Sequence, residues 1–128
     1  MENRYFSFMN NKTEQFGIEN KPYKLSEKHI KRLSDVLSEL KRLPISEIVL
    51  YGSCARNAAG YDSDIDLALI ADDFSSDTHR EIRRLRSDYT DGDGPDVDLH
   101  CISEENYKAA ESSFVKNVRK DGIVLWKK

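Results

Sequence analysis

The stretch LYGSCARNAAGYDSDIDLALI, residues 50–70, decides the fold because a polar, turn-rich loop within it separates two apolar strands. The first strand ends at Gly52 and the second begins at Asp64. Side chains alternate along a strand, so Asp64 and Asp66 share one face at a separation of roughly 6–7 Å. Charged groups are costly inside a sheet, and two of them on one face therefore suggest a chemical role.

The flanking residues predict one α/β or α+β domain. Apolar side chains at three- and four-residue spacing indicate an amphipathic helix over 26–43 with Ser26 as its N-cap. Strands are predicted over 45–52, 64–71 and 96–102, with a short strand or extended tail over 123–126. Further helices are predicted over 77–89 and 103–122, the second one stopping at Gly122. We expect this domain to span 25–128, with an N-terminal extension over 1–24.

Composition argues against several classes of protein. The 128-residue chain carries a net charge of −3 and has a pI near 5.6, whereas proteins that hold a nucleic-acid backbone are normally basic. No run approaches the roughly 18 apolar residues of a membrane span, and polar residues interrupt the N-terminus where a signal peptide would be apolar. We therefore expect a cytoplasmic protein in which Cys54 and Cys101 are free thiols.

The strand over 96–102 repeats the pattern of alternating carboxylates, with Asp96 and Asp98 on one face. If this strand lies beside the one that carries Asp64 and Asp66, three carboxylates converge, the third being either Asp96 or Asp98. Converging carboxylates repel one another unless a cation is present, and Mg²⁺ is typically bound by one or two carboxylates together with substrate phosphates. Two such ions about 3.5–4 Å apart can stabilise the attacking and leaving oxygens of nucleotidyl transfer.

The turn formed by Gly52 and Ser53 fits the same chemistry. Glycine has no Cβ, so a triphosphate can approach its backbone closely. A serine hydroxyl at the start of a following helix, where N–H groups are free, is a good phosphate contact. The loop would then hold the phosphates of a nucleotide over the strands that carry the carboxylates.

These residues resemble the GSxxRG…SDxDL signature of the DNA polymerase β-like nucleotidyltransferase superfamily, and most closely its small stand-alone members, the minimal nucleotidyltransferases. A later Val97-Asp98-Leu99 stands where the superfamily has its third metal-binding aspartate, which favours Asp98 over Asp96. The resemblance covers about residues 26–126 and departs at Asn57, where the family usually has glycine. The matching residues are Gly52, Ser53, Ala55, Arg56, Ser63, Asp64, Asp66 and Leu67.

The resemblance implies a fold and a role for most of these residues. The implied fold is a small mixed sheet with helices packed mainly on one face, as in the catalytic core of the superfamily. Asp98 would complete the coordination of the catalytic metal ion and help to deprotonate the acceptor hydroxyl. Arg56 would either contact phosphates or pair with a structural acid. The full set comprises Gly52, Ser53, Arg56 and Ser63 for nucleotide binding, and Asp64, Asp66 and Asp98 for metal binding and catalysis.

The resemblance also implies a Mg²⁺-dependent enzyme that transfers an NMP from an NTP to a hydroxyl and releases pyrophosphate. We expect AMP from ATP, with two Mg²⁺ ions. Because 128 residues leave little room for an acceptor-binding domain, the acceptor surface is expected in a partner or in a second copy of the chain. Minimal nucleotidyltransferases are often paired with HEPN-type proteins, so we expect the antitoxin of a toxin–antitoxin pair. A small-molecule or RNA acceptor, and a non-catalytic binding module, are the alternatives.

Other polar residues are expected to have ordinary roles. The arginines of the helix over 77–89 are interpreted as a solvated face. His29, His79 and His100 are interpreted as ordinary histidines, although His100 shares a face with Asp98 and could lie at the edge of the site.

Overall fold

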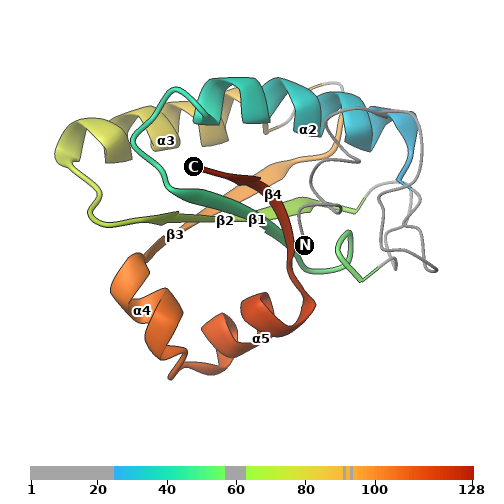
Figure 1. Cartoon of the computed structure of the whole chain (residues 1–128). Coiled ribbons are helices and arrows are strands. Elements are labelled where there is room, and N and C mark those ends of the chain that lie inside the picture. Colours follow the sequence, from blue (N-terminus) through green and yellow to red (C-terminus); the bar gives the residue numbers. More distant parts are fainter. Residues whose placement is uncertain (1–24, 57–62, 91, 93) are drawn as a thin grey trace.

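The computed structural model describes residues 25–56, 63–90, 92 and 94–128; the expected extension over 1–24 and the departure at Asn57 lie outside them. Four strands form one sheet in the order β3-β2-β1-β4 (Figure 1). β1 pairs antiparallel with β2 and β4, whereas β2 pairs parallel with β3, so the expected mixed sheet is confirmed. The strands are β1 (Glu47–Tyr51), β2 (Ile65–Ala71), β3 (Val97–Ser103) and β4 (Ile123–Lys127).

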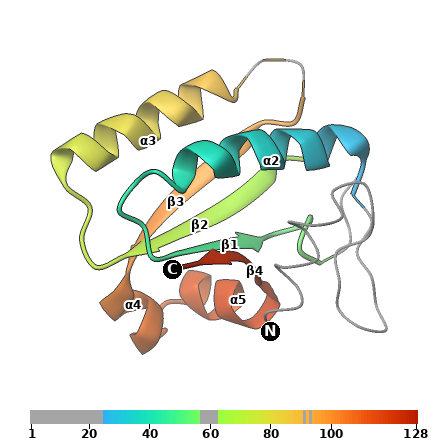
Figure 2. The same ribbon diagram turned by 45° about the horizontal axis from the view of Figure 1, so that its top comes forward.

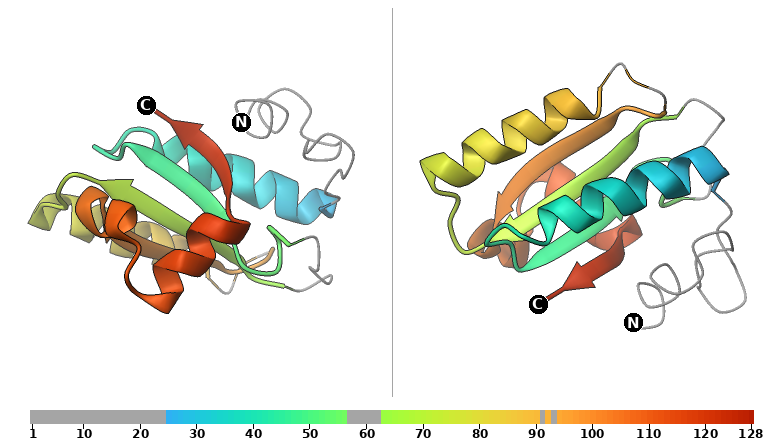
Figure 3. Two further views of the ribbon diagram at one scale, coloured as in Figure 1. Left: turned by 60° about the horizontal axis from the view of Figure 1, so that its bottom comes forward. Right: turned by 90° about the horizontal axis from the view of Figure 1, so that it is seen from above.

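Helices cover the sheet in two layers. The longer helices α2 (Glu27–Leu40) and α3 (Ser76–Asp88) lie side by side over one face, as Figure 2 shows. The shorter α4 (Glu104–Ala109) and α5 (Ser113–Asp121) lie on the opposite face (Figure 1, Figure 3). The main helical layer is therefore on one face, as the resemblance implied, and a smaller layer supports the other. No helix in the described segments is long and apolar enough to cross a membrane.

The sequence of β2 explains why helices cover both faces. All of its residues are buried except Asp66, which is half-buried. A strand that is apolar on both faces is typical of the centre of a covered sheet. The larger core cluster joins one face to α2 and α3 and includes Leu33, Leu37, Ile48, Leu50, Ile65, Leu67, Leu69, Ile82 and Leu99. The smaller cluster joins the other face to α5 and comprises Val49, Ala68, Ile70, Ile102, Val115 and Val118.

The single helix predicted over 103–122 is wrong, because the chain forms two helices there. Ala110 adopts a left-handed conformation with φ 49° and ψ 51° and ends α4. Ser112 then caps α5 by accepting a hydrogen bond from the N–H of Val115. An unbroken helix of that length would run about 30 Å, whereas a strand of seven residues spans only about 23 Å. The break lets α5 turn back along the sheet, and α5 ends at Gly122 as predicted.

The larger cluster should carry much of the stability. Leu37 is 1% exposed and lies between α2 and the sheet, so Leu37→Ala should lower the free energy of unfolding by about 2–5 kcal/mol through lost burial and a residual cavity. Urea unfolding followed by circular dichroism measures this change. The adjacent, exposed Ser38 provides the control, since Ser38→Ala should stay within about 0.5 kcal/mol of wild type. A loss below about 1 kcal/mol for Leu37→Ala would contradict this packing.

Candidate active site

Three polar side chains lie in a row across the sheet, on the face that α4 and α5 cover. Asp66 of β2 is the register partner of Asp98 on β3 and of Tyr51 on β1. All three lie on the same face as Ala68 and Ile70, which pack toward α5. The parallel pairing therefore brings two of the sequence-predicted carboxylates side by side.

The electrostatics of Asp66 show which other charges are near it. Burial raises the pKa of Asp66, the charges of Asp98 and then Asp64 raise it further, and His100 and Arg56 lower it. Asp64, which immediately precedes β2, is exposed. Three carboxylates thus act on one another at this edge of the sheet, with the Arg56 guanidinium close enough to oppose them.

Asp96, the alternative third carboxylate, lies at the entrance of β3. Its carbonyl oxygen accepts a hydrogen bond of 2.9 Å from the N–H of Ile65, and it lies two residues before Asp98. The carboxylates that raise the pKa of Asp66 are Asp98 and Asp64. The geometry therefore favours Asp98 over Asp96 as the partner of Asp66.

The predicted turn packs directly against Asp66. β1 ends at Tyr51, and Gly52 follows with φ +77°, a conformation that favours glycine. A Cβ at Gly52 would collide with Oδ2 of Asp66, so only glycine lets the turn approach the carboxylate this closely. The carbonyl of Gly52 accepts from the N–H groups of Ala55 and Arg56, both at 3.1 Å. The turn, with half-buried Ser53 in it, lies next to the carboxylates as the sequence predicted.

An aromatic cluster borders the carboxylates, and the sequence analysis did not assign it a role. Nε2 of His100 donates to Oδ2 of Asp98 at 3.0 Å. The His100 ring lies 6.1 Å from the Tyr51 ring and 5.3 Å from the Phe114 ring, and Tyr51 and Phe114 are 5.4 Å apart. Phe114 is 38% exposed and is the exposed large apolar side chain of the described part of the chain. The position of His100 two residues after Asp98 was a usable signal, but nothing in the sequence connects Phe114 to β3.

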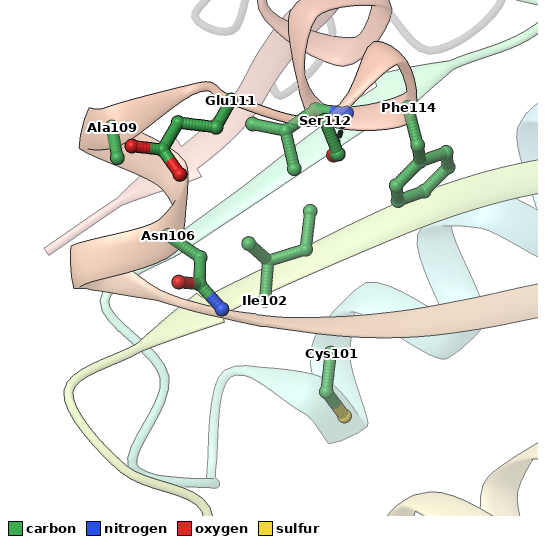
Figure 4. A pocket seen from close by; sticks show the side chains of 8 residues that line it. Cys101, Ile102, Asn106, Ala109, Glu111, Ser112 and Phe114 are labelled. Carbon is green, nitrogen blue, oxygen red and sulfur yellow. Dashed lines mark hydrogen bonds between the residues drawn. The ribbon is translucent and has the colours of Figure 1, made fainter.

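A pocket between β3, α4 and α5 continues from Phe114 (Figure 4). The side chains of Phe114, Ile102 and Ser112 face it, and Asn106 and Glu111 stand at its α4 side, whereas the Cys101 side chain points away. The pocket thus combines an apolar floor with polar groups at its margin. Phe114 connects the pocket to His100, which is the hydrogen-bond partner of Asp98.

Two of the four arginines of α3, on the opposite face of the sheet, form exposed ion pairs as expected of a solvated face, whereas Arg86 is half-buried and donates to the carbonyl of Leu99 on β3. Arg80 pairs with Asp77 at 2.8 Å, and Arg84 contacts Glu81, Asp88 and Glu39. These exposed pairs contribute little to stability.

The donor set suits a hard divalent cation. No group of three His, Cys, Asp or Glu side chains in the described ranges is already arranged as a metal site. Even so, Asp66 is half-buried beside two like charges, and the Gly52 turn packs against its Oδ2. Mutual repulsion of this kind is relieved by a cation with a preference for oxygen ligands. The residues present therefore fit a divalent cation such as Mg²⁺ by their chemistry.

Comparisons with known proteins identify the family and support the fold. Residues 30–125 match the family model described as the nucleotidyltransferase domain. A crystal structure from Sulfolobus solfataricus at 1.40 Å resolution, of a protein whose nucleotidyltransferase function is inferred, has a TM-score of 0.52 and 22% identity over 77% of this chain and 79% of that chain. A substituted form of the toxin–antitoxin MntA-HpeT has a TM-score of 0.50 and 24% identity over 82% of this chain and 75% of that chain. These two likenesses show the fold. No curated protein matches significantly.

Removal of the charge at Asp66 should stabilise the protein when divalent cations are absent. Because burial and neighbouring carboxylates raise its pKa, the ionised form opposes folding increasingly as the pH rises through that raised pKa. Asp66→Asn should therefore raise Tm by about 2–4 °C at pH 8 in EDTA, with a smaller difference toward pH 4. Differential scanning calorimetry across this pH range measures the effect.

Asp73→Asn provides the matched control, because Asp73 is exposed just beyond the end of β2 and its substitution should leave Tm unchanged. A Tm for Asp66→Asn at or below that of wild type at pH 8 would show that the carboxylates do not repel one another in the folded chain.

Proposed function

We propose that this chain, which belongs to the nucleotidyltransferase domain family, transfers AMP from ATP to a hydroxyl acceptor in a Mg²⁺-dependent reaction. The observation that carries the proposal is the register of Asp66 with Asp98 beside the Gly52 turn. This arrangement combines carboxylates suited to Mg²⁺ with a turn that can receive phosphates. In the reaction the acceptor oxygen forms a bond to the α-phosphorus, the bond to the bridging oxygen breaks, and pyrophosphate leaves.

Each residue of the site has a proposed task. Asp64, Asp66 and Asp98 hold Mg²⁺, which when bound neutralises phosphate charge and stabilises the attacking and leaving oxygens. The triphosphate is received by the Gly52-Ser53 turn. Ser63 and Arg56 assist it, since both lie at the same end of the sheet and Arg56 is near enough to lower the pKa of Asp66.

Asp98 has an additional proposed task, which is to accept the proton of the acceptor hydroxyl. It lies on the β3 side of the row and is hydrogen-bonded to His100. The acceptor would then approach over His100 and Phe114, where the aromatic cluster and the adjoining pocket offer an apolar surface. A catalytic base must lie within hydrogen-bond reach of the proton it removes, and of the three carboxylates Asp98 is closest to this surface.

For the acceptor we propose a hydroxyl on a protein partner of the HEPN type, which would make this chain the antitoxin of a toxin–antitoxin pair. The exposed Phe114 and its pocket supply a surface of the kind that protein partners use. One of the solved structures that share the fold comes from a toxin–antitoxin pair. A second copy of this chain is the other acceptor that such a surface could receive.

The reaction can be tested with the four α-³²P-labelled NTPs and Mg²⁺, with and without lysate from the source organism. We expect label from ATP on a protein acceptor with the wild type, and a loss of at least about 100-fold for Asp64→Ala/Asp66→Ala, since both proposed metal ligands are removed. Gel electrophoresis, thin-layer chromatography and RNA extraction separate the three acceptor classes.

Label on RNA or on a small molecule would support transfer and refute the protein acceptor. Label that is equal in the double variant would refute the proposed site. The absence of both transfer and Mg²⁺-dependent nucleotide binding in the wild type would refute the enzymatic function.

The identity of the third carboxylate has its own test. Asp98→Asn should reduce transfer at least about 100-fold while Asp96→Asn stays within about threefold of wild type, because only Asp98 stands in register with Asp66. Initial rates of label transfer measure both variants. The reverse order of losses would assign the third ligand to Asp96.

A further inference from the structure

His29 is a buried histidine that the proposed reaction does not use. It lies in the first turn of α2 and is 1% exposed. Its Nδ1 lies 2.6 Å from Oγ of Ser26, and its Nε2 lies 2.8 Å from the carbonyl oxygen of Ser63. A carbonyl oxygen can only accept, so Nε2 carries a proton, and in the neutral ring Nδ1 accepts from the Ser26 hydroxyl. Both ring nitrogens are therefore used to connect α2 to the backbone before β2.

Two further contacts hold the same short segment. The buried thiol of Cys54 donates to the carbonyl of Asp64 at 3.4 Å, and the N–H of Ile65 donates to the carbonyl of Asp96. Burial and two nearby carboxylates raise the pKa of Cys54 to about 12, so the thiol remains a donor at neutral pH. Two consecutive peptide groups, Ser63–Asp64 and Asp64–Ile65, are thus bound by groups from α2, from the turn and from the entrance of β3.

Asp64 depends on these contacts because β2 begins only at Ile65. Its side chain is exposed, so packing does not fix its position. A rotation of the Ser63–Asp64 peptide would move the carboxylate away from Asp66. Among the three contacts, the one from His29 is the shortest, and its ring is fixed in the core.

We propose that His29 is a positioning residue that orients the Ser63–Asp64 peptide and thereby places the Asp64 carboxylate for metal and nucleotide binding. The inference rests on the proposed role of Asp64 as a ligand. Groups that orient ligands through hydrogen bonds are typically worth about 10–100-fold in metal affinity or activity.

The test uses His29→Leu, which removes both hydrogen bonds at similar volume, and His29→Gln, whose amide N–H can still reach the Ser63 carbonyl. The probe is Mn²⁺ with a non-hydrolysable ATP analogue, titrated by calorimetry at a temperature well below the Tm of each variant. We expect His29→Leu to weaken binding about 10-fold and His29→Gln to recover most of the loss. His79→Gln, on an exposed histidine of α3, should bind as the wild type does.

Amide hydrogen exchange without metal or nucleotide gives a second readout. In His29→Leu the amides of Asp64 and Ile65 should exchange about 10-fold faster, while the amide of Leu33 in α2 should change much less. Lowered Tm with unchanged binding and unchanged exchange at 64–65 would overturn the proposal and leave His29 a purely structural residue. If the wild type does not bind the probe, the proposed function is refuted, and the proposed role of His29, which depends on it, is refuted as well.

Discussion

The parallel pairing of β2 with β3 is the constraint on which the rest of the structure depends, because it sets Asp66 directly beside Asp98 on one face of the sheet. Two half-buried carboxylates in adjacent strand positions repel each other, and burial together with this repulsion raises the pKa of Asp66. The folded chain tolerates this repulsion because the other residues of β2 are buried. Natural proteins often retain such locally unfavourable groups where function requires them.

The two faces of the sheet differ in role: one carries most of the apolar core, and the other carries the proposed active site. The face under α2 and α3 holds the larger apolar cluster, and it contains no part of the carboxylate row. The face under α4 and α5 is covered only in part, so that Asp66, Asp98 and the ring of Phe114 remain accessible. The break between α4 and α5 matters here, because it leaves a pocket between these helices and the end of β3 (Figure 4).

Much of this arrangement could be predicted from short-range patterns. The alternation of charged and apolar residues predicted a strand with Asp66 on one face, the glycine before Ser53 predicted a turn, and the apolar periodicity of 26–43 predicted α2. These features depend on residues within a few positions of one another. The strand bounds were likewise accurate to within about two residues.

The remaining features depend on contacts between residues that are distant in sequence. β2 and β3 become neighbours through the α3 crossover. From the sequence alone, the carboxylates could be predicted to converge only if these two strands were assumed to be adjacent. His29 contacts Ser63 across 34 positions, and Phe114 meets His100 only because α5 folds back. At Ala110, a residue with high helix propensity takes a left-handed conformation, so propensity alone predicts the wrong outcome.

The central claim is that the paired carboxylates form a metal-dependent nucleotide site. A crystal structure with Mn²⁺ and a non-hydrolysable ATP analogue, with anomalous diffraction to locate the ions, tests it most directly. The account predicts Mn²⁺ bound to Asp66 and Asp98 and triphosphate density against the Gly52-Ser53 turn. Mn²⁺ and nucleotide bound elsewhere, with Asp98 still hydrogen-bonded to His100 and Asp66 bound to no ion, would contradict it.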